Sequence, residues 1–136
     1  GPFILSKILI NYWIDMKKHG KIINIVSQAA FHGSTSGHAH YASSKAGLVG
    51  FTISLAREVA PYGINVTAVA PGIMRSPMNE EVLKDPKRVD AYLERIPLRR
   101  VSEPVDVARS VLFLASTQAD YITGATIDVT GGMLMR

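Results

Sequence analysis

Apolar residues recur at three- and four-residue spacings in three stretches of the chain, which predicts three amphipathic helices. The first covers residues 3–16, ends on a basic turn at Gly20, and is expected to bury most of its apolar face in the core. The second covers residues 41–62, begins with many small residues and is ended by Pro61 and Gly63. The third starts at Pro104, because proline suits the first turn of a helix, and runs toward residue 119.

Three apolar runs between these helices predict β-strands. Residues 21–27 form a β-branched run without clean alternation, which indicates a strand buried on both faces, as in a parallel sheet. Residues 64–70 and 126–129 predict two further strands. Helices that alternate with strands imply parallel pairing with right-handed crossovers, so the fold class is α/β.

The remaining segments are polar or broken by glycine and proline. Residues 31–40 are rich in Gly, Ser, Thr and His and predict a loop, whereas residues 73–77 predict an irregular turn. Residues 78–96 carry short, charged helical segments broken by Pro86, and we expect them to form a flap. Three strands make a thin sheet, and doubly wound folds usually begin with a strand. We therefore expect residues 1–136 to be a single partial domain, the second half of such a fold.

Composition narrows the function classes. With 136 residues, 47% hydrophobic and 19% charged, the chain is globular in character. It has no cysteine, which excludes a disulfide scaffold and a thiolate nucleophile and fits a cytoplasmic protein. The apolar stretch 3–13 is interrupted by Lys7 and Asn11 and is too short to span a bilayer, so no membrane role is expected. The net charge of +4 suits an anionic cofactor, an acidic protein or nucleic acid.

Candidate chemistry gathers at the carboxyl ends of the first two strands. Ser27 ends the first strand and Pro71-Gly72 ends the second, while Tyr41 and Lys45 lie one helical turn apart at the start of the second helix. A nearby ammonium stabilises a phenolate and lowers the pKa of a tyrosine, and Lys45 is placed to do this for Tyr41. Tyr41 would then act as general acid or base on a carbonyl or alcohol oxygen that Ser27 orients.

These motifs resemble the C-terminal half of a short-chain dehydrogenase/reductase, a family of nicotinamide-dependent Rossmann enzymes. Residues 24–27 (Asn-Ile-Val-Ser) are similar to the serine strand, residues 41–45 (Tyr-Ala-Ser-Ser-Lys) to the Tyr-x-x-x-Lys helix, and residues 65–72 to the segment beside the nicotinamide. The resemblance implies that Ser27, Tyr41 and Lys45 are catalytic. It also implies that the cofactor is held by Tyr41, Lys45, Pro71, Gly72, Ile73 and Ser76.

Two departures from the family pattern bear on these assignments. The stretch from Ser27 to Tyr41 is one residue longer than the commonest family spacing. The chain also lacks the Gly-x-x-x-Gly-x-Gly turn that binds the cofactor diphosphate and the Asn-Asn-Ala-Gly segment. We therefore expect the C-terminal portion of a doubly wound, parallel-sheet Rossmann fold, with the N-terminal βαβ half absent. The cofactor would be NAD or NADP, and this portion alone would be inactive or only marginally folded.

The resemblance is closest to the β-ketoacyl carrier-protein reductases, so the substrate would be a small ketone or alcohol or an acyl-carrier thioester. Lys17 and Lys18 suit an acidic carrier, but Pro61-Tyr62 at the other helix end does not, and a polyol or sugar-acid dehydrogenase remains an alternative. The family also implies a homo-oligomer, a tetramer, built on the first two helices.

Three other readings compete with the enzyme. The chain could be a non-catalytic oligomerisation or binding module that keeps these helices. A nucleic-acid role would use Arg95, Arg99 and Arg100, but no aromatic platform accompanies them. We therefore expect no nucleic-acid partner. A zinc site at His32, His38 and His40 lacks a carboxylate ligand in the loop, so no metal is expected.

Overall fold

The computed structural model describes residues 1–35 and 37–136 and alternates helices with strands. The α-helices and strands follow in the order α1 (Pro2–Asp15), β1 (Gly20–Ile25), α2 (Ala29–His32), α3 (Ala39–Val59), β2 (Ile64–Pro71), α4 (Glu80–Leu83), α5 (Pro86–Arg95), α6 (Pro104–Ala115) and β3 (Thr126–Val129). Short 3-10 helices occur at η1 (Ala60–Tyr62), η2 (Pro77–Asn79) and η3 (Thr117–Ala119). The predicted α/β class is confirmed.

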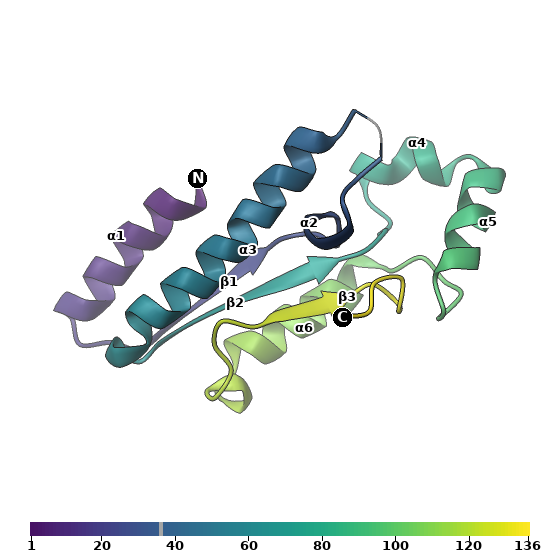
Figure 1. Ribbon diagram of the computed structural model, residues 1–136. Helices are drawn as coiled ribbons and strands as arrows, with labels where there is room; N and C mark the ends of the chain where they lie inside the picture. Colours follow the sequence, from purple (N-terminus) through teal and green to yellow (C-terminus); the bar gives the residue numbers. More distant parts are fainter. Residues whose placement is uncertain (36) are drawn as a thin grey trace.

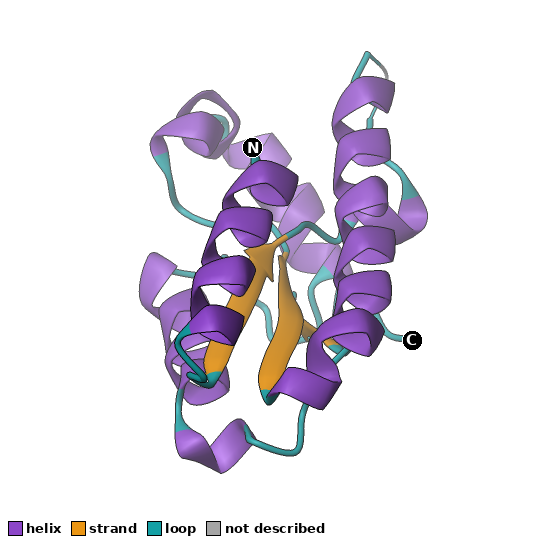
Figure 2. Cartoon of the chain, turned by 90° about the vertical axis from the view of Figure 1, so that its left-hand side faces the viewer, coloured by secondary structure: helices purple, strands orange, loops and turns teal. Residues whose placement is uncertain are grey.

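The three strands form one parallel sheet in the order β1-β2-β3. Gly20 is opposite Ile64 at the start of the first ladder, and Val69 is opposite Ile127 in the second. Helices α1 and α3 cover one face of the sheet and α6 covers the other (Figure 1, Figure 2). This three-layer arrangement is that of a doubly wound fold.

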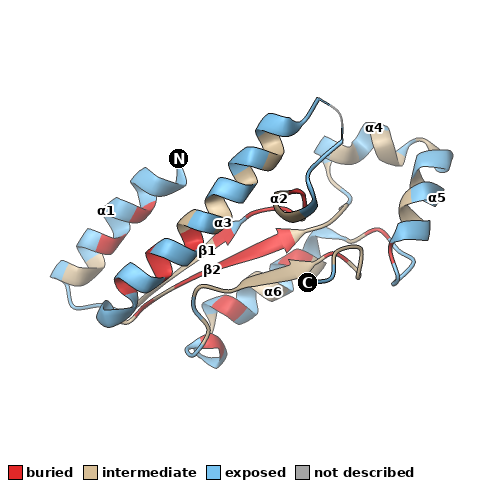
Figure 3. Cartoon of the chain, in the orientation of Figure 1, coloured by how far each residue is buried: buried red, intermediate tan, exposed pale blue. Residues whose placement is uncertain are grey.

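Strand β2 lies at the centre of the sheet and forms the core with both helical layers. Alternate residues Val66 and Ala68 face α3, whereas Val69 packs with Leu114 of α6. The side chains of residues 68–70 and Val66 have no exposed surface, which appears as the continuous buried strand in Figure 3. Strand β2 is therefore buried toward both helical layers, as the central strand of a parallel sheet is.

Strand β1 departs from the prediction of burial on both faces. Four of its six residues are only partly buried, and Ile25 is 44% exposed. The physical reason is its position: within the described residues, β1 pairs with β2 alone and so forms an edge of the sheet. The same pattern of apolar residues occurs in a central strand and in an edge strand.

Helix α1 also departs from the prediction, because its apolar face is not mostly core. Ile10 is its buried apolar residue, with Trp13 and Ile14 packed partly against the same cluster. Four other apolar side chains of this helix are 61–64% exposed: Phe3, Ile4, Leu5 and Ile8. Periodicity tells which residues share a helix face, but it does not tell whether another element covers that face.

Several element ends differ from their predicted positions. The expected loop 31–40 overlaps one helical turn, α2, and α3 starts two residues earlier than predicted. Helix α6 ends at Ala115 because Ser116 is extended, with φ −84° and ψ 167°, and its hydroxyl accepts a hydrogen bond from the Gln118 amide that opens η3. Strand β1 ends at Ile25, two residues before Ser27.

Helices α4 and α5 form the flap that Pro86 and the charged segments predict. Figure 1 shows them projecting from the sheet, beyond the ends of the strands. No helix in the described part of the chain is long and apolar enough to cross a membrane.

Candidate active site

The carboxyl ends of the three strands are joined by backbone hydrogen bonds. The Gln28 amide donates to the Pro71 carbonyl over 3.1 Å, and the Gly72 amide donates to the Val129 carbonyl over 3.0 Å. These bonds continue the sheet ladders past the last residues of the strands. Ser27 and the Pro71-Gly72 turn therefore lie at one edge of the sheet, where parallel sheets place their ligand sites.

Ser27 occupies the turn between β1 and α2. Its side chain is buried, and its Oγ accepts a hydrogen bond from the Ala29 amide over 3.1 Å. The Ser27 carbonyl accepts from the Ala30 amide over 3.0 Å. Because both oxygens are engaged by the first turn of α2, the orientation of Ser27 depends on where α2 is held.

Lys45 connects the start of α3 to the end of β1. Its Nζ donates to the Ile25 carbonyl over 2.8 Å and lies 5.9 Å from the centroid of the Tyr41 ring. Tyr41 and Lys45 are both half-buried. One ammonium thus contacts the tyrosine on its own helix and the strand end two residues before Ser27, which brings all three predicted catalytic residues to the same edge.

Gly72 lies at a close approach of two backbone segments. A Cβ at this position would lie 3.1 Å from the Thr130 Cα, an atom that cannot rotate away. The Oε1 of Gln28, which would lie 3.3 Å from that same Cβ, is buried and accepts no hydrogen bond from the described residues. The turn after β2 is therefore packed directly against the segment that follows β3. Beside it lies Gln28 Oε1, an acceptor without a hydrogen bond from the described residues.

Ile73 and Ser76 lie at the base of the flap. The Ile73 carbonyl accepts from both the amide and the hydroxyl of Ser102, over 3.3 and 3.0 Å. Ser76 Oγ accepts from the Asn79 amide group over 3.3 Å. Among the described residues, no hydrogen bond links Ile73 or Ser76 to Tyr41 or Ser27. Ile73 and Ser76 are connected to this edge of the sheet by the chain itself, through Pro71-Gly72.

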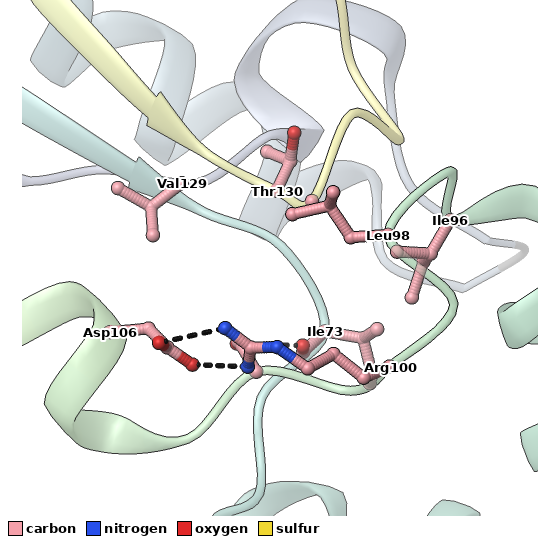
Figure 4. Close-up of a pocket in the computed structure, with 9 residues that line it drawn as sticks. Ile73, Ile96, Leu98, Arg100, Asp106, Val129 and Thr130 are labelled. Atoms are coloured by element: carbon pink, nitrogen blue, oxygen red, sulfur yellow. Dashed lines mark hydrogen bonds and ion pairs between the residues drawn. The ribbon is translucent and has the colours of Figure 1, made fainter.

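A cavity of about 190 Å³ adjoins Ile73 (Figure 4). Arg100 crosses its wall and donates to both carboxylate oxygens of Asp106, over 2.6 and 2.9 Å. The hydrogen bonds from Arg100, together with the Glu103 amide, hold the pKa of the Asp106 carboxyl well below its usual range. The other lining residues are Ile96, Leu98, Ser102, Val129, Thr130 and Gly131.

The pairing of Arg100 with Asp106 was not predicted from the sequence. One sequence signal points to Asp106: it is an acidic residue three positions after Glu103, at the start of a predicted helix. In a capping box, such a side chain accepts a hydrogen bond from the backbone amide of the N-cap residue, here Glu103.

His38, just before α3, and His40, in the first turn of α3, lie close together. The rings of His38 and His40 lie 6.4 Å apart, and Thr35 Oγ1 contacts His38 Nδ1 at 3.2 Å. Across residues 1–35 and 37–136, no group of three histidine or acidic side chains is arranged to hold a metal ion. Ser36, in the predicted loop 31–40, lies outside the described residues.

Comparison with known proteins identifies the family. A family model described as enoyl-(acyl carrier protein) reductase matches residues 1–134. The chain belongs to the short-chain dehydrogenase/reductase family. Curated relatives include the 3-oxoacyl-acyl-carrier-protein reductases of Rickettsia felis, 48% identical over 133 residues, and Thermotoga maritima, 38% identical over 135 residues. The match covers 98% and 99% of this chain but 54% and 53% of the relatives, so this short-chain dehydrogenase/reductase chain spans about half their length.

Solved structures of family members superpose closely on the chain. A protein from Agrobacterium tumefaciens with bound NADP gives a TM-score of 0.93 at 37% identity, covering 98% of this chain and 54% of that one. A 3-oxoacyl-acyl-carrier-protein reductase from Brucella melitensis gives 0.91 at 35% identity, covering 99% and 49%. A 4-hydroxyisoleucine dehydrogenase complexed with NADH gives 0.93 at 30% identity, covering 97% and 54%. The predicted Rossmann-type fold of this short-chain dehydrogenase/reductase is confirmed.

Proposed function

We propose that the protein to which this chain belongs interconverts a carbonyl and a secondary alcohol with a nicotinamide cofactor. The observation that carries the proposal is the position of Lys45, whose Nζ lies 5.9 Å from the Tyr41 ring centroid and 2.8 Å from the Ile25 carbonyl. Membership of the family and the NADP- and NADH-bound neighbours support it.

In this proposal the three side chains move one proton and hold one oxygen. Tyr41 donates its phenolic proton to the carbonyl oxygen during reduction and accepts a proton from the alcohol during oxidation. The Lys45 ammonium stabilises the negative charge that develops on the phenol oxygen. The Ser27 hydroxyl donates a hydrogen bond to the substrate oxygen and keeps it within reach of Tyr41.

The residues at this edge fit the nicotinamide half of the cofactor. Gly72 lets the turn after β2 lie close to Thr130, and the buried Gln28 Oε1 beside it accepts no hydrogen bond from the described residues. Lys45 and Tyr41 offer donors, and Ile73 and Ser76 extend the same edge toward the flap. The nicotinamide supplies or accepts the hydride when it is bound. We propose NAD or NADP, held by Tyr41, Lys45, Pro71, Gly72, Ile73 and Ser76.

For the substrate we propose a 3-oxoacyl thioester on an acidic carrier, because the curated relatives carry that name. A groove of about 490 Å³ between the ends of α1 and α3 contains the basic residues Lys17, Lys18 and His19. It lies where β1 and β2 begin, at the opposite end of the sheet from Ser27. Because of this separation, the proposal for the carrier rests on the relatives, and a small ketone or polyol is the alternative.

The test uses the full-length protein and follows the absorbance of NADPH and NADH. A 3-oxoacyl carrier-protein thioester, a simple ketone and a sugar acid are compared as substrates. We expect cofactor oxidation with the thioester and slower or no oxidation with the others. Oxidation of neither cofactor with any carbonyl substrate would contradict the proposed activity, whereas turnover of the simple ketone alone would exclude the carrier-bound substrate.

A second role, assembly with another copy of the chain, is favoured by the exposed apolar face of α1. Phe3, Ile4, Leu5 and Ile8 are all mostly exposed, and Phe3 already contacts Phe51 of α3 with ring centroids 5.8 Å apart. Contiguous exposed apolar surface of this kind marks an interface. We propose a homo-oligomer, and the family resemblance implies a tetramer. Light scattering should show that Ile4→Glu and Ile8→Glu dissociate it; a monomeric wild-type protein would contradict this role.

A further inference from the structure

Phe31, in α2, joins the two elements that carry the proposed catalytic residues. Its ring packs against a buried cluster formed by Val26, next to Ser27, and by Ala68 and Ala70 of β2. Leu48 and Val49, which follow Lys45 on α3, pack against the same cluster. Phe31 and the helix that carries Tyr41 therefore share one buried cluster at the strand ends, and α2 lies next to α3.

A cation covers the Phe31 ring. The guanidinium carbon of Arg136 lies 3.7 Å from the ring centroid, a stacking distance for arginine on an aromatic face. Arg136 is itself held by Asp128 of β3, through Nε and a terminal nitrogen that donate to the two carboxylate oxygens over 3.0 and 2.9 Å. Two hydrogen bonds to one carboxylate fix the plane of a guanidinium, so Asp128 sets how Arg136 meets Phe31.

The segment between Asp128 and Arg136 is anchored beside the same turn. Figure 1 shows this segment folding back just beyond the end of β3. The Thr130 hydroxyl exchanges hydrogen bonds with the backbone of Leu134, and Met133 Sδ accepts from the Gln28 side chain over 3.4 Å. A short segment with internal hydrogen bonds thus places the guanidinium of Arg136 against Phe31.

We propose that Arg136 is a positioning residue for the reaction: held by Asp128, it fixes Phe31 and thereby the Ser27 turn against α3. We name the set Asp128, Arg136 and Phe31 the Phe31 clamp. The Ser27 oxygens are bonded to the first turn of α2, so a shift of Phe31 moves the Ser27 hydroxyl relative to Tyr41. The kinetic consequence of the clamp rests on the proposed function, but its effect on the Ser27 turn does not.

The kinetic test compares four variants of the full-length protein with wild type. Arg136→Met keeps an unbranched apolar side chain over the ring but removes the charge and both bonds to Asp128, and Asp128→Asn keeps the shape of the partner without its charge. Arg109→Met, an exposed arginine of α6, is the matched control. We expect Arg136→Met and Asp128→Asn to lower kcat by roughly three- to tenfold, because small misplacements of reacting groups cost this much or more. The KM for NADPH should stay unchanged.

The fourth variant, Arg136→Lys, tests whether the cation or the planar group matters. It keeps a charge over the ring but cannot make two parallel bonds to Asp128. We expect partial recovery of kcat relative to Arg136→Met. Since a merely destabilised protein would lose cofactor affinity and active fraction together, an unchanged KM for NADPH with graded kcat distinguishes positioning from general damage.

A second readout is independent of turnover. The Ala29 and Ala30 amides donate to the Ser27 oxygens, so their hydrogen exchange reports the order of this turn. We expect faster exchange at both amides in Arg136→Met and wild-type exchange in Arg109→Met. Wild-type exchange in Arg136→Met would overturn the clamp, and faster exchange with wild-type kcat would overturn its role in positioning. A wild-type protein without any turnover would instead count against the proposed function, while the exchange comparison would still decide on the clamp.

Discussion

The strand ends that carry Ser27 and Pro71 differ from the flap of helices α4 and α5 in how they are held in place. The strand ends belong to a sheet whose central strand is buried from Val66 to Ala70 and whose ladders continue past the last strand residues. The flap has no buried residue between positions 77 and 95. Its two helices follow one another after a short connection and project from the sheet (Figure 1).

The flap is attached through its base. Met74 and Ser102 form an isolated parallel bridge, and Arg75 pairs with Glu103 over 2.9 Å. Arg100 pairs with Asp106 just after the flap returns to the sheet. A rigid sheet edge suits groups that must keep their mutual geometry, whereas a segment pinned at its ends can change sequence and shape without disturbing them. We therefore assign the reaction to the strand ends and substrate choice to the flap.

The largest effect expected at the strand ends is on turnover. Tyr41→Phe removes the proton that the reaction transfers and leaves the ring in place, so kcat should fall by about 10²- to 10⁴-fold. The exposed Tyr121→Phe should retain wild-type activity. The measurement is steady-state NADPH oxidation by the full-length protein, and near wild-type kcat in Tyr41→Phe would transfer the acid/base role to another group.

The junction between the two regions should be the most sensitive to backbone substitution. Gly131 has φ +65°, and a Cβ there would lie 2.7 Å from Cγ2 of Ile96, the buried residue at the end of the flap. Gly131→Ala should lower the free energy of unfolding by about 2–3 kcal/mol, since strain and overpacking add.

Gly124→Ala is the matched comparison for Gly131→Ala. Gly124 has φ +72°, but its added Cβ would lie 3.6 Å from the Ala56 side chain, an ordinary contact. Only the backbone conformation is then strained, and we expect a loss of about 1 kcal/mol in urea unfolding. Equal losses in the two variants would show that Ile96 does not pack against Gly131 as described.

A substitution in the flap should separate substrate binding from stability. Met78 is 83% exposed, so Met78→Ala should change the free energy of unfolding by less than about 0.5 kcal/mol. We expect the KM for a long acyl thioester to rise roughly threefold, as for one lost apolar contact, with kcat preserved. An unchanged KM for long and short acyl groups alike would contradict the assignment of substrate choice to this part of the flap.

The smallest effect concerns pH. The pKa of Asp106 is lowered in the folded protein, chiefly by its hydrogen bonds from Arg100. As the pH falls below about 4, the unfolded chain therefore binds a proton before the folded protein does, and stability is lost in that direction. Arg100→Met should make the fall of Tm between about pH 5 and pH 3 shallower than in wild type.

The control for this pH effect is Asp90→Asn. Asp90 is an exposed carboxylate on α5 that forms no ion pair within the described part of the chain. This variant should keep the wild-type slope of Tm against pH. A wild-type slope in Arg100→Met as well would mean that the pair with Asp106 does not persist in solution.

Much of the fold follows from local patterns in the sequence. The apolar period located α1, α3 and α6, apolar runs located the three strands, and the alternation of strands with helices predicted that the strands are parallel. What the patterns could not supply is the environment of each element. Ile25 belongs to a run that resembles a central strand, and Ile8 to a helix face that resembles a core face, yet both are exposed because no described element covers them.

The candidate site likewise has residues that the sequence could group and contacts that it could not predict. Ser27, Tyr41, Lys45 and Pro71-Gly72 could be grouped from their positions at strand ends and one helix face, and the structure places them at one edge. The bond from Lys45 to the Ile25 carbonyl could not be foreseen, because backbone acceptors carry no sequence signal. The contact of Arg136 with Phe31 joins residues that are far apart in the sequence and depends on the path of the segment after β3.

We propose that Ser27 and Tyr41 act on one substrate oxygen as a unit at the strand ends. A double-mutant cycle tests this, with Ser27→Ala, Tyr41→Phe and both together compared in the full-length protein by kcat/KM for the 3-oxoacyl substrate. Groups that act as a unit are strongly non-additive, so the double variant should lose about as much as Tyr41→Phe alone. Losses that multiply across the two single variants would contradict the claim.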